Sequence, residues 1–126
     1  MTRPYVLLVE DNAQNRYLAT YLLESGGYEV GCVTTGLEAI EAIRGRRPDL
    51  VLIDILLPEM DGYELGRRLR AEPQFHDLPI MALTSYAMPG DRHKAMAIGF
   101  NGYMEKPINP ETFLAEVRQV LKFAKS

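Results

Sequence analysis

The chain has 126 residues, of which 47% are hydrophobic and 25% charged, and its formal net charge at pH 7 is -3. Because these values are ordinary for one globular domain, we expect a single domain over residues 1–126, with no output domain after it. The sequence pI near 5.4 argues against direct binding of nucleic acid. The apolar runs are shorter than the roughly 20 residues that cross a bilayer, and no signal segment opens the chain, so we expect a cytoplasmic protein without a membrane partner.

The first part of the chain alternates strand and helix patterns. Residues 5–9 form an apolar run that predicts a strand, and residues 28–33 predict a second strand. Between them, a helix that stops at the glycine pair 26–27 is predicted by four residues at helical spacing: Tyr17, Leu18, Tyr21 and Leu22. The lone cysteine, Cys32, has apolar neighbours in the second strand, so we expect it to be buried rather than reactive.

The next unit repeats this order. Thr35 and Glu38 have the spacing of a capping box at a helix start. The apolar stripe of that helix consists of Leu37, Ile40 and Ile43. Residues 50–53 are apolar at every position, as in a central parallel strand covered on both faces, and this strand ends on Asp54.

The second half of the chain continues the alternation. Asp61 and Glu64 open a third helix in the same way. The remaining elements are a strand over residues 79–83, a short helix that carries residues 95–98, a strand over residues 102–104 and a last helix opened by Asn109 and Pro110. The pattern predicts an α/β fold of the (βα)5 type: a three-layer sandwich whose five-stranded parallel sheet has the order 2-1-3-4-5 and carries helices on both faces.

Polar residues follow four of the predicted strands at their carboxyl ends, where open parallel sheets bind ligands. Glu10 and Asp11 follow the first strand, Asp54 ends the third, Thr84 the fourth, and Lys106 follows the fifth. The first and third strands are neighbours in the expected order, so the three carboxylates should lie close together and require a cation. Mg²⁺ suits such oxygen ligands, and Lys106 brings a second positive charge. No His or Cys lies near these positions, so neither zinc nor copper is indicated.

A carboxylate flanked by Mg²⁺ and lysine suits phosphoryl transfer, which depends on positioning and on neutralising charge. We therefore expect Asp54 to accept a phosphoryl group. Asp11 would hold the metal directly, and Glu10 directly or through water. Lys106 and the Thr84 hydroxyl would contact phosphoryl oxygens. Each residue alone has an ordinary structural interpretation, and the prediction depends on their conjunction.

Four segments together resemble the response regulator receiver family: Val9-Glu10-Asp11-Asn12, Asp54 followed by Leu57-Pro58-Glu59-Met60-Asp61-Gly62, Leu83-Thr84-Ser85, and Lys106-Pro107. The resemblance covers essentially the whole chain and implies a flavodoxin-like fold. It implies that Asp54 is the phosphoacceptor, that Glu10 and Asp11 bind Mg²⁺, and that Leu56 lends a backbone carbonyl to the metal. It also implies that Thr84 and Tyr103 are switch residues and that Lys106 is the lysine of the phosphorylation site.

The resemblance further implies partners. Such proteins take a phosphoryl group from a histidine kinase or a histidine phosphotransfer protein, and they catalyse the transfer to their own aspartate. The implied chain is thus a two-component signalling switch rather than an enzyme for a separate substrate. It would act on a downstream protein target through residues 88–124, as a monomer or as a phosphorylation-dependent dimer. We also expect the bulky Leu56 and Tyr86 to hinder the attacking water and to prolong the life of the aspartyl phosphate.

Other functions are compatible with parts of the pattern. Haloacid-dehalogenase-like phosphatases also use an aspartate nucleophile with Mg²⁺, but they carry an Asp-x-Asp motif after the first strand, whereas Asp54-Ile55-Leu56 lacks the second aspartate. A flavodoxin-like cofactor binder would need a Gly-rich phosphate loop after the first strand. A receiver-like module that works through binding alone is the remaining alternative, and possession of every site residue argues against it.

Overall fold

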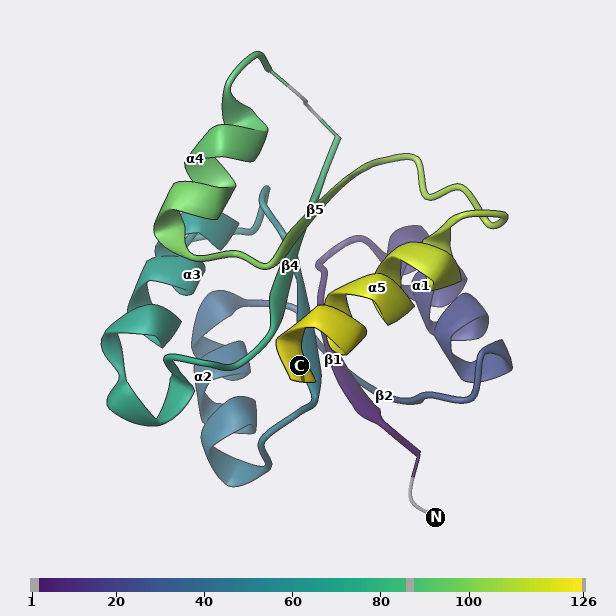
Figure 1. Cartoon of the computed structure of the whole chain (residues 1–126), viewed down its shortest axis with the longest axis horizontal. Coiled ribbons are helices and arrows are strands. Elements are labelled where there is room, and N and C mark those ends of the chain that lie inside the picture. Colours follow the sequence, from purple (N-terminus) through teal and green to yellow (C-terminus); the bar gives the residue numbers. More distant parts are fainter. Residues whose placement is uncertain (1–2, 86–87, 126) are drawn as a thin grey trace.

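The computed structural model describes residues 3–85 and 88–125, where five parallel strands alternate with five α-helices (Figure 1). The strands are β1 (Tyr5–Val9), β2 (Glu29–Val33), β3 (Leu50–Asp54), β4 (Ile80–Thr84) and β5 (Gly102–Glu105). The helices are α1 (Ala13–Ser25), α2 (Gly36–Gly45), α3 (Gly62–Ala71), α4 (Asp91–Ile98) and α5 (Phe113–Lys125), with a 3-10 turn, η1 (Pro73–Phe75), after α3. The strand order is β2-β1-β3-β4-β5, which confirms the predicted order.

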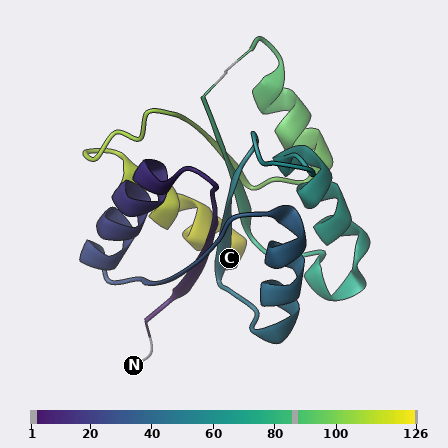
Figure 2. The same cartoon turned by 180° about the vertical axis from the view of Figure 1, so that it is seen from behind.

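Helices cover both faces of the sheet, with α1 and α5 on one face and α2, α3 and α4 on the other (Figures 1 and 2). The core is divided in the same way. In β3, Val51 and Ile53 pack with α2, α3 and α4, whereas Leu50 and Leu52 pack with α1 and α5. All five residues of β3 are buried, as expected for a central strand with helices on both sides. The fold is thus the predicted three-layer, flavodoxin-like sandwich.

Side-chain caps fix where three helices begin. The cap residues Asn12, Thr35 and Asp61 each accept a hydrogen bond from the backbone N–H three residues later. The caps at Thr35 and Asp61 were predicted from the sequence. They matter for function because α1 and α3 begin directly after the loops that follow β1 and β3.

A glycine allows α3 to begin very close to the end of β3. The backbone N–H of Gly62 donates to the Ile55 carbonyl at 2.9 Å. A Cβ at Gly62 would lie 2.7 Å from the Asp54 carbonyl oxygen and 2.8 Å from the Ile55 Cα, which is closer than side-chain atoms pack. Glycine at this position therefore permits the backbone path that carries Asp54.

Some residues of the predicted helical patterns are exposed, and the predicted burial of Cys32 is wrong. Tyr17 and Tyr21 are 76% and 61% exposed, because α1 packs on the sheet through other residues, namely Ala19, Leu22 and Leu23. Leu37 of α2 is 56% exposed, whereas Ile40 and Ile43 are buried as predicted. Cys32 lies in a strand but is exposed, because β2 is the edge strand and pairs with β1 alone.

The parallel topology separates the two edges of the sheet. Because all strands run in the same direction, their carboxyl ends share one edge. The chain enters β1 and leaves α5 toward the other edge, and Figure 1 marks both chain ends in the lower half of the view. In residues 3–85 and 88–125, no helix has the length and apolar character of a membrane-spanning segment.

Candidate functional site

Three carboxylates meet at the carboxyl edge of the sheet, where β1 and β3 are neighbours. Glu10 follows β1 and is 1% exposed, Asp54 is the last residue of β3 and is 4% exposed, and Asp11 is exposed in the loop before α1. One carboxylate oxygen from each lies within 4.8 Å of the other two. The structure thus brings Asp54, at the end of β3, together with two residues of the loop after β1 that lie 44 and 43 positions earlier in the sequence.

Lys106 approaches these carboxylates from the loop after β5. Its backbone N–H donates to the Thr84 carbonyl at 2.7 Å, which ties this loop to the end of β4. Its side chain is 6% exposed, with Nζ in a hydrogen-bonded ion pair with Glu10 and 3.3 Å from Asp54 Oδ2. The other oxygen of Asp54, Oδ1, accepts a hydrogen bond from the Leu56 N–H at 3.1 Å. Both oxygens of the buried Asp54 carboxylate therefore have a partner.

The environment of Glu10 shows the cost of gathering negative charge in a buried place. The pKa of Glu10 is raised to about 7, with burial as the largest cause and the neighbouring Asp54 carboxylate as the second. The Lys106 ammonium acts in the opposite direction. A second cation in the cluster would favour the charged carboxylates in the same way as Lys106 does.

The donor set fits a hard divalent cation. All three side chains offer carboxylate oxygens, and in residues 3–85 and 88–125 no cluster of potential ligands adds a His or Cys. Mg²⁺ binds through one or two carboxylates and keeps several waters, so a partly open acidic pocket suits it. The exposed Asp11 leaves the cluster accessible from solvent on that side.

Thr84 and Leu56 border Asp54. Thr84 ends β4, the strand beside β3, and is 3% exposed. The Leu56 side chain is half exposed, and its backbone N–H is the group that donates to Asp54 Oδ1. Tyr86, the second residue expected to shield the site, lies outside the described residues.

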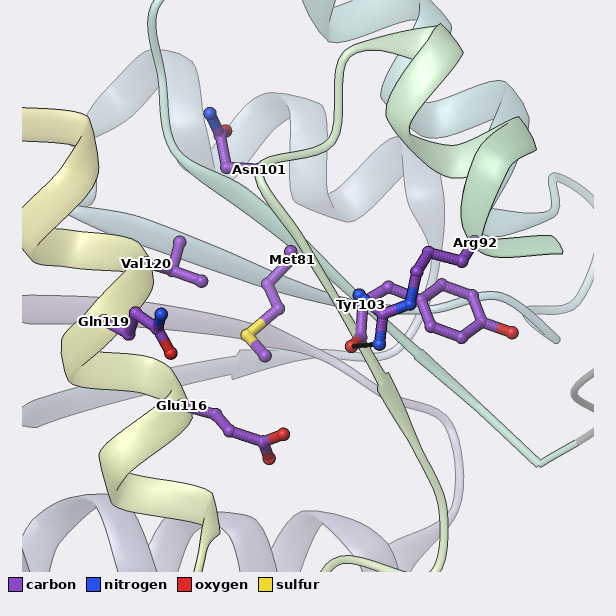
Figure 3. Close-up of a pocket in the computed structure, with 8 residues that line it drawn as sticks. Met81, Arg92, Asn101, Tyr103, Glu116, Gln119 and Val120 are labelled. Carbon is purple, nitrogen blue, oxygen red and sulfur yellow. Dashed lines mark hydrogen bonds between the residues drawn. The ribbon is translucent and has the colours of Figure 1, made fainter.

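Tyr103 lies on β5 between α4 and α5, beside a cavity of about 210 Å³ (Figure 3). Its ring is packed next to Arg92 of α4, whose guanidinium carbon is 5.2 Å from the ring centroid. Arg92 Nη2 donates a hydrogen bond to the Tyr103 backbone carbonyl at 3.4 Å. The side chain is buried, and its hydroxyl has no hydrogen-bond partner among the described residues. Burial raises the pKa of this phenol, because the phenolate would lose its hydration.

The opposite wall of this cavity belongs to α5. In Figure 3, Glu116, Gln119 and Val120 extend from the helix toward β5, and Asn101 lies where the chain enters that strand. The cavity thus joins β5 and α5 with the Arg92 end of α4, three elements of the predicted response surface.

One residue near the site was missed from the sequence. Arg16, in the first turn of α1, donates through Nη1 to the backbone carbonyl of Glu10 at 3.0 Å. A guanidinium four residues after the helix cap Asn12 is the only signal in the sequence, and it also fits a solvated helix face. The contact follows from the turn between β1 and α1, which no periodicity specifies.

Comparison with known proteins agrees with this geometry. The profile of the response regulator receiver domain matches residues 6–118. The polar-differentiation response regulator DivK of Brucella anthropi is 38% identical over 116 residues, which cover 92% of this chain and 94% of the relative. The chemotaxis response regulator CheY4 of Vibrio cholerae has a TM-score of 0.88 at 33% identity, over 94% of this chain and 99% of that chain.

A third relative is similar in structure and carries a metal. The receiver domain of the sensor histidine kinase PA1611 from Pseudomonas aeruginosa has a TM-score of 0.84 at 36% identity, over 99% of this chain and 100% of that chain. In that structure a magnesium ion is coordinated in the active site cleft.

Proposed function

Because the chain belongs to the response regulator receiver family, we propose that it works in two-component signalling by accepting a phosphoryl group on Asp54. The observation that carries the proposal is the position of Asp54. Its carboxylate ends a buried strand, lies with Glu10 and Asp11 in one acidic cluster, and has the Lys106 ammonium 3.3 Å away. This combination provides a nucleophile and a cation in one place.

In the proposed reaction, an Asp54 carboxylate oxygen bonds to phosphorus while the bond from phosphorus to the donor's histidine nitrogen breaks. Lys106 stabilises the charge on the phosphoryl oxygens, and the Thr84 hydroxyl donates to one of them. Attack of water on the aspartyl phosphate releases inorganic phosphate and restores Asp54. The protein thus catalyses its own phosphorylation and dephosphorylation.

We further propose that Mg²⁺ is the cofactor, held by Asp11 and Asp54, by Glu10 directly or through water, and by the backbone carbonyl of Leu56. Bound Mg²⁺ would neutralise charge on the phosphoryl oxygens during transfer. The clustered carboxylate oxygens support this proposal, as does the magnesium ion in the similar PA1611 receiver domain.

The signal is proposed to pass from Thr84 to Tyr103 and so to the response surface on α4, β5 and α5. Tyr103 is suited to such movement, because its buried hydroxyl gives up no hydrogen bond to a described residue when the ring moves. The phosphodonor is a histidine kinase or a histidine phosphotransfer protein, and the reader is a downstream protein target, all acting in the cytoplasm. The receiver works as a monomer or as a phosphorylation-dependent dimer.

Intact-protein mass spectrometry tests the central step. After incubation with acetyl phosphate and Mg²⁺, we expect one added phosphoryl group on the parent chain and none on Asp54→Asn, which is nearly isosteric but cannot form the acyl phosphate. A parent chain that gains no phosphoryl group would support a module that works through binding alone. Steady turnover of a small phosphate ester would instead indicate a phosphatase.

The lifetime of the aspartyl phosphate is proposed to depend on Leu56, whose half-exposed side chain borders the site. An apolar side chain there hinders the approach of the hydrolytic water and offers it no hydrogen bond. A phosphate-release time course should therefore be faster for Leu56→Asn than for the parent. Equal or slower release from the variant would contradict this role. Tyr86→Glu is the corresponding variant of the second proposed shielding residue.

A further inference from the structure

We propose that Arg16 is a positioning residue for the loop between β1 and α1, and that it acts by fixing the peptide group that joins Glu10 to Asp11. The inference rests on the proposed function, because that loop supplies two of the proposed Mg²⁺ ligands. The consequence is that Mg²⁺ affinity depends on Arg16, which is not one of the three clustered acidic residues and which binds the backbone carbonyl of Glu10.

The loop is short, and most of its polar groups are already held. The Glu10 N–H donates to the Val33 carbonyl at 3.0 Å, so the start of the loop is tied to β2. The Asn12 N–H donates to Glu10 Oε2 at 3.3 Å, and the Asn12 side chain accepts from the Asn15 N–H at 2.9 Å. These bonds fix the residues on both sides of Asp11.

Arg16 makes a hydrogen bond to the peptide group that precedes Asp11. Its Nη1 donates to the Glu10 carbonyl oxygen at 3.0 Å. This oxygen and the Asp11 nitrogen belong to one planar peptide group, so holding the oxygen sets the direction in which Asp11 leaves the strand. Among residues 3–85 and 88–125, the Asp11 carboxylate has no hydrogen-bond or ion-pair partner of its own. Its position therefore depends on the backbone.

The backbone of Arg16, from which its side chain extends, is held in the first turn of α1. Its backbone N–H donates to the Asn12 carbonyl at 3.0 Å, in the first turn of α1, and the residue is half buried. The guanidinium thus connects the helix to the end of β1. Its fixed charge makes a second, opposite contribution, because a cation near the cluster repels Mg²⁺.

These two contributions predict opposite results for Arg16→Met. Loss of positioning weakens Mg²⁺ binding, whereas loss of a positive charge strengthens it. Residues that orient metal ligands typically change metal affinity by about 10- to 100-fold when they are replaced, so we expect at least a roughly tenfold weaker affinity. Arg16→Lys keeps the charge and one donor, and we expect it to recover most of the loss.

Isothermal titration calorimetry with MgCl₂, on the unphosphorylated full chain, measures this affinity without any phosphodonor. Arg67→Met, which removes a half-exposed arginine of α3 outside the proposed response surface, is the matched control and should bind Mg²⁺ as the parent does. Thermal unfolding without Mg²⁺ establishes that each variant is folded. In the parent, NMR should show Arg16 guanidinium protons protected from exchange, which tests the hydrogen bond even if Arg16→Met does not fold.

The outcomes separate the two proposals. A folded Arg16→Met that binds Mg²⁺ as tightly as the parent, or more tightly, would overturn the positioning role. Unprotected guanidinium protons in the parent would overturn it as well. A parent chain without measurable Mg²⁺ affinity would instead refute the proposed metal site, and with it the premise of the inference. Weaker binding by Arg16→Met with recovery in Arg16→Lys would support it.

Discussion

Arg70 offers the sharpest test of how the fold holds α4. Its guanidinium lies at the end of α3 and donates four hydrogen bonds to three acceptors. Nε and Nη2 both donate to the Gly99 carbonyl, at 3.0 and 2.8 Å, Nη1 donates to the Phe75 carbonyl at 2.8 Å, and Nη2 also donates to Asn101 Oδ1 at 2.9 Å. Arg70 thus connects the carboxyl end of α4 to α3, to η1 and to the entry of β5.

Two opposing contributions set the expected change in stability when Arg70 is replaced: the hydrogen bonds that are lost and the desolvation of the guanidinium that is avoided. Arg70 has no salt bridge within the described residues, and burial lowers the pKa of its guanidinium. In Arg70→Met, three acceptors lose the Arg70 donor at roughly 1 kcal/mol each, although the Phe75 carbonyl keeps the Leu78 N–H and Asn101 Oδ1 keeps the Ile80 N–H. The guanidinium no longer has to be desolvated on folding, which offsets part of this loss, so we expect about 2 to 3 kcal/mol less stability.

Urea unfolding followed by far-UV circular dichroism measures this loss. The slope of the unfolding free energy against urea concentration should be unchanged if only the folded state is affected. The melting temperature should fall by about 10 °C. Arg67→Met is the matched control, because Arg67 is half exposed on the same helix and lies 3.8 Å from its partner Glu64. Its replacement should change stability by less than about 0.5 kcal/mol.

Hydrogen exchange localises the effect. The N–H groups of Gly99 and Phe100 donate to the Ala95 carbonyl at the end of α4, at 3.2 and 3.0 Å, so they should exchange faster in Arg70→Met than in the parent. The reasoning would be refuted by a stability loss below about 1 kcal/mol, or by a loss no larger than that of Arg67→Met.

Three further substitutions test separate features. Tyr103→Phe removes a buried hydroxyl without a partner among the described residues, so the unphosphorylated protein should gain about 1 kcal/mol in urea unfolding; no gain would contradict this. Glu59 has a left-handed backbone with φ 68°, so Glu59→Gly should stabilise by about 0.5 kcal/mol in the same assay, and a loss would reveal a compensating contact of the carboxylate. Gly62→Ala forces a Cβ to within 2.7 Å of the Asp54 carbonyl oxygen, so we expect a loss of about 2 kcal/mol and weaker labelling by acetyl phosphate; a variant as stable and as reactive as the parent would exclude this steric role.

Much of the fold could be predicted from the sequence, because its local signals agree with one another. The fully apolar run before Asp54 indicated a central parallel strand, and the caps Thr35 and Asp61 marked helix starts. Once the strand order was expected, the carboxyl-edge rule placed Glu10 and Asp54 side by side without any knowledge of side-chain conformation.

The errors arise where a residue type does not decide which side of an element is buried. Tyrosines such as Tyr17 satisfy a helical stripe but tolerate water, and α1 buries Ala19 instead. Cys32 is exposed because only one neighbouring strand pairs with β2, which is a property of the whole sheet.

The contacts of Arg16 and Arg70 could not be predicted for a different reason. Each guanidinium reaches backbone carbonyls through a long, flexible side chain. Because every residue has a carbonyl, the sequence does not indicate which residue is the acceptor. Arg70 binds Gly99 and Asn101, which are 29 and 31 positions away. Such contacts become visible only when the turns and helix ends are fixed in space.

The separation of the two sheet edges has a practical use. The chain enters β1 at Tyr5 and leaves α5 at the edge of the sheet opposite the carboxyl ends of the strands (Figure 1), whereas Asp54 ends β3 at the carboxyl edge. A fluorescent reporter or a second protein joined before β1 or after α5 should therefore leave the approach to the proposed phosphoacceptor open. Such fusions could serve as biosensors, because the surface around Asp54 that we propose to contact the phosphodonor keeps its own residues.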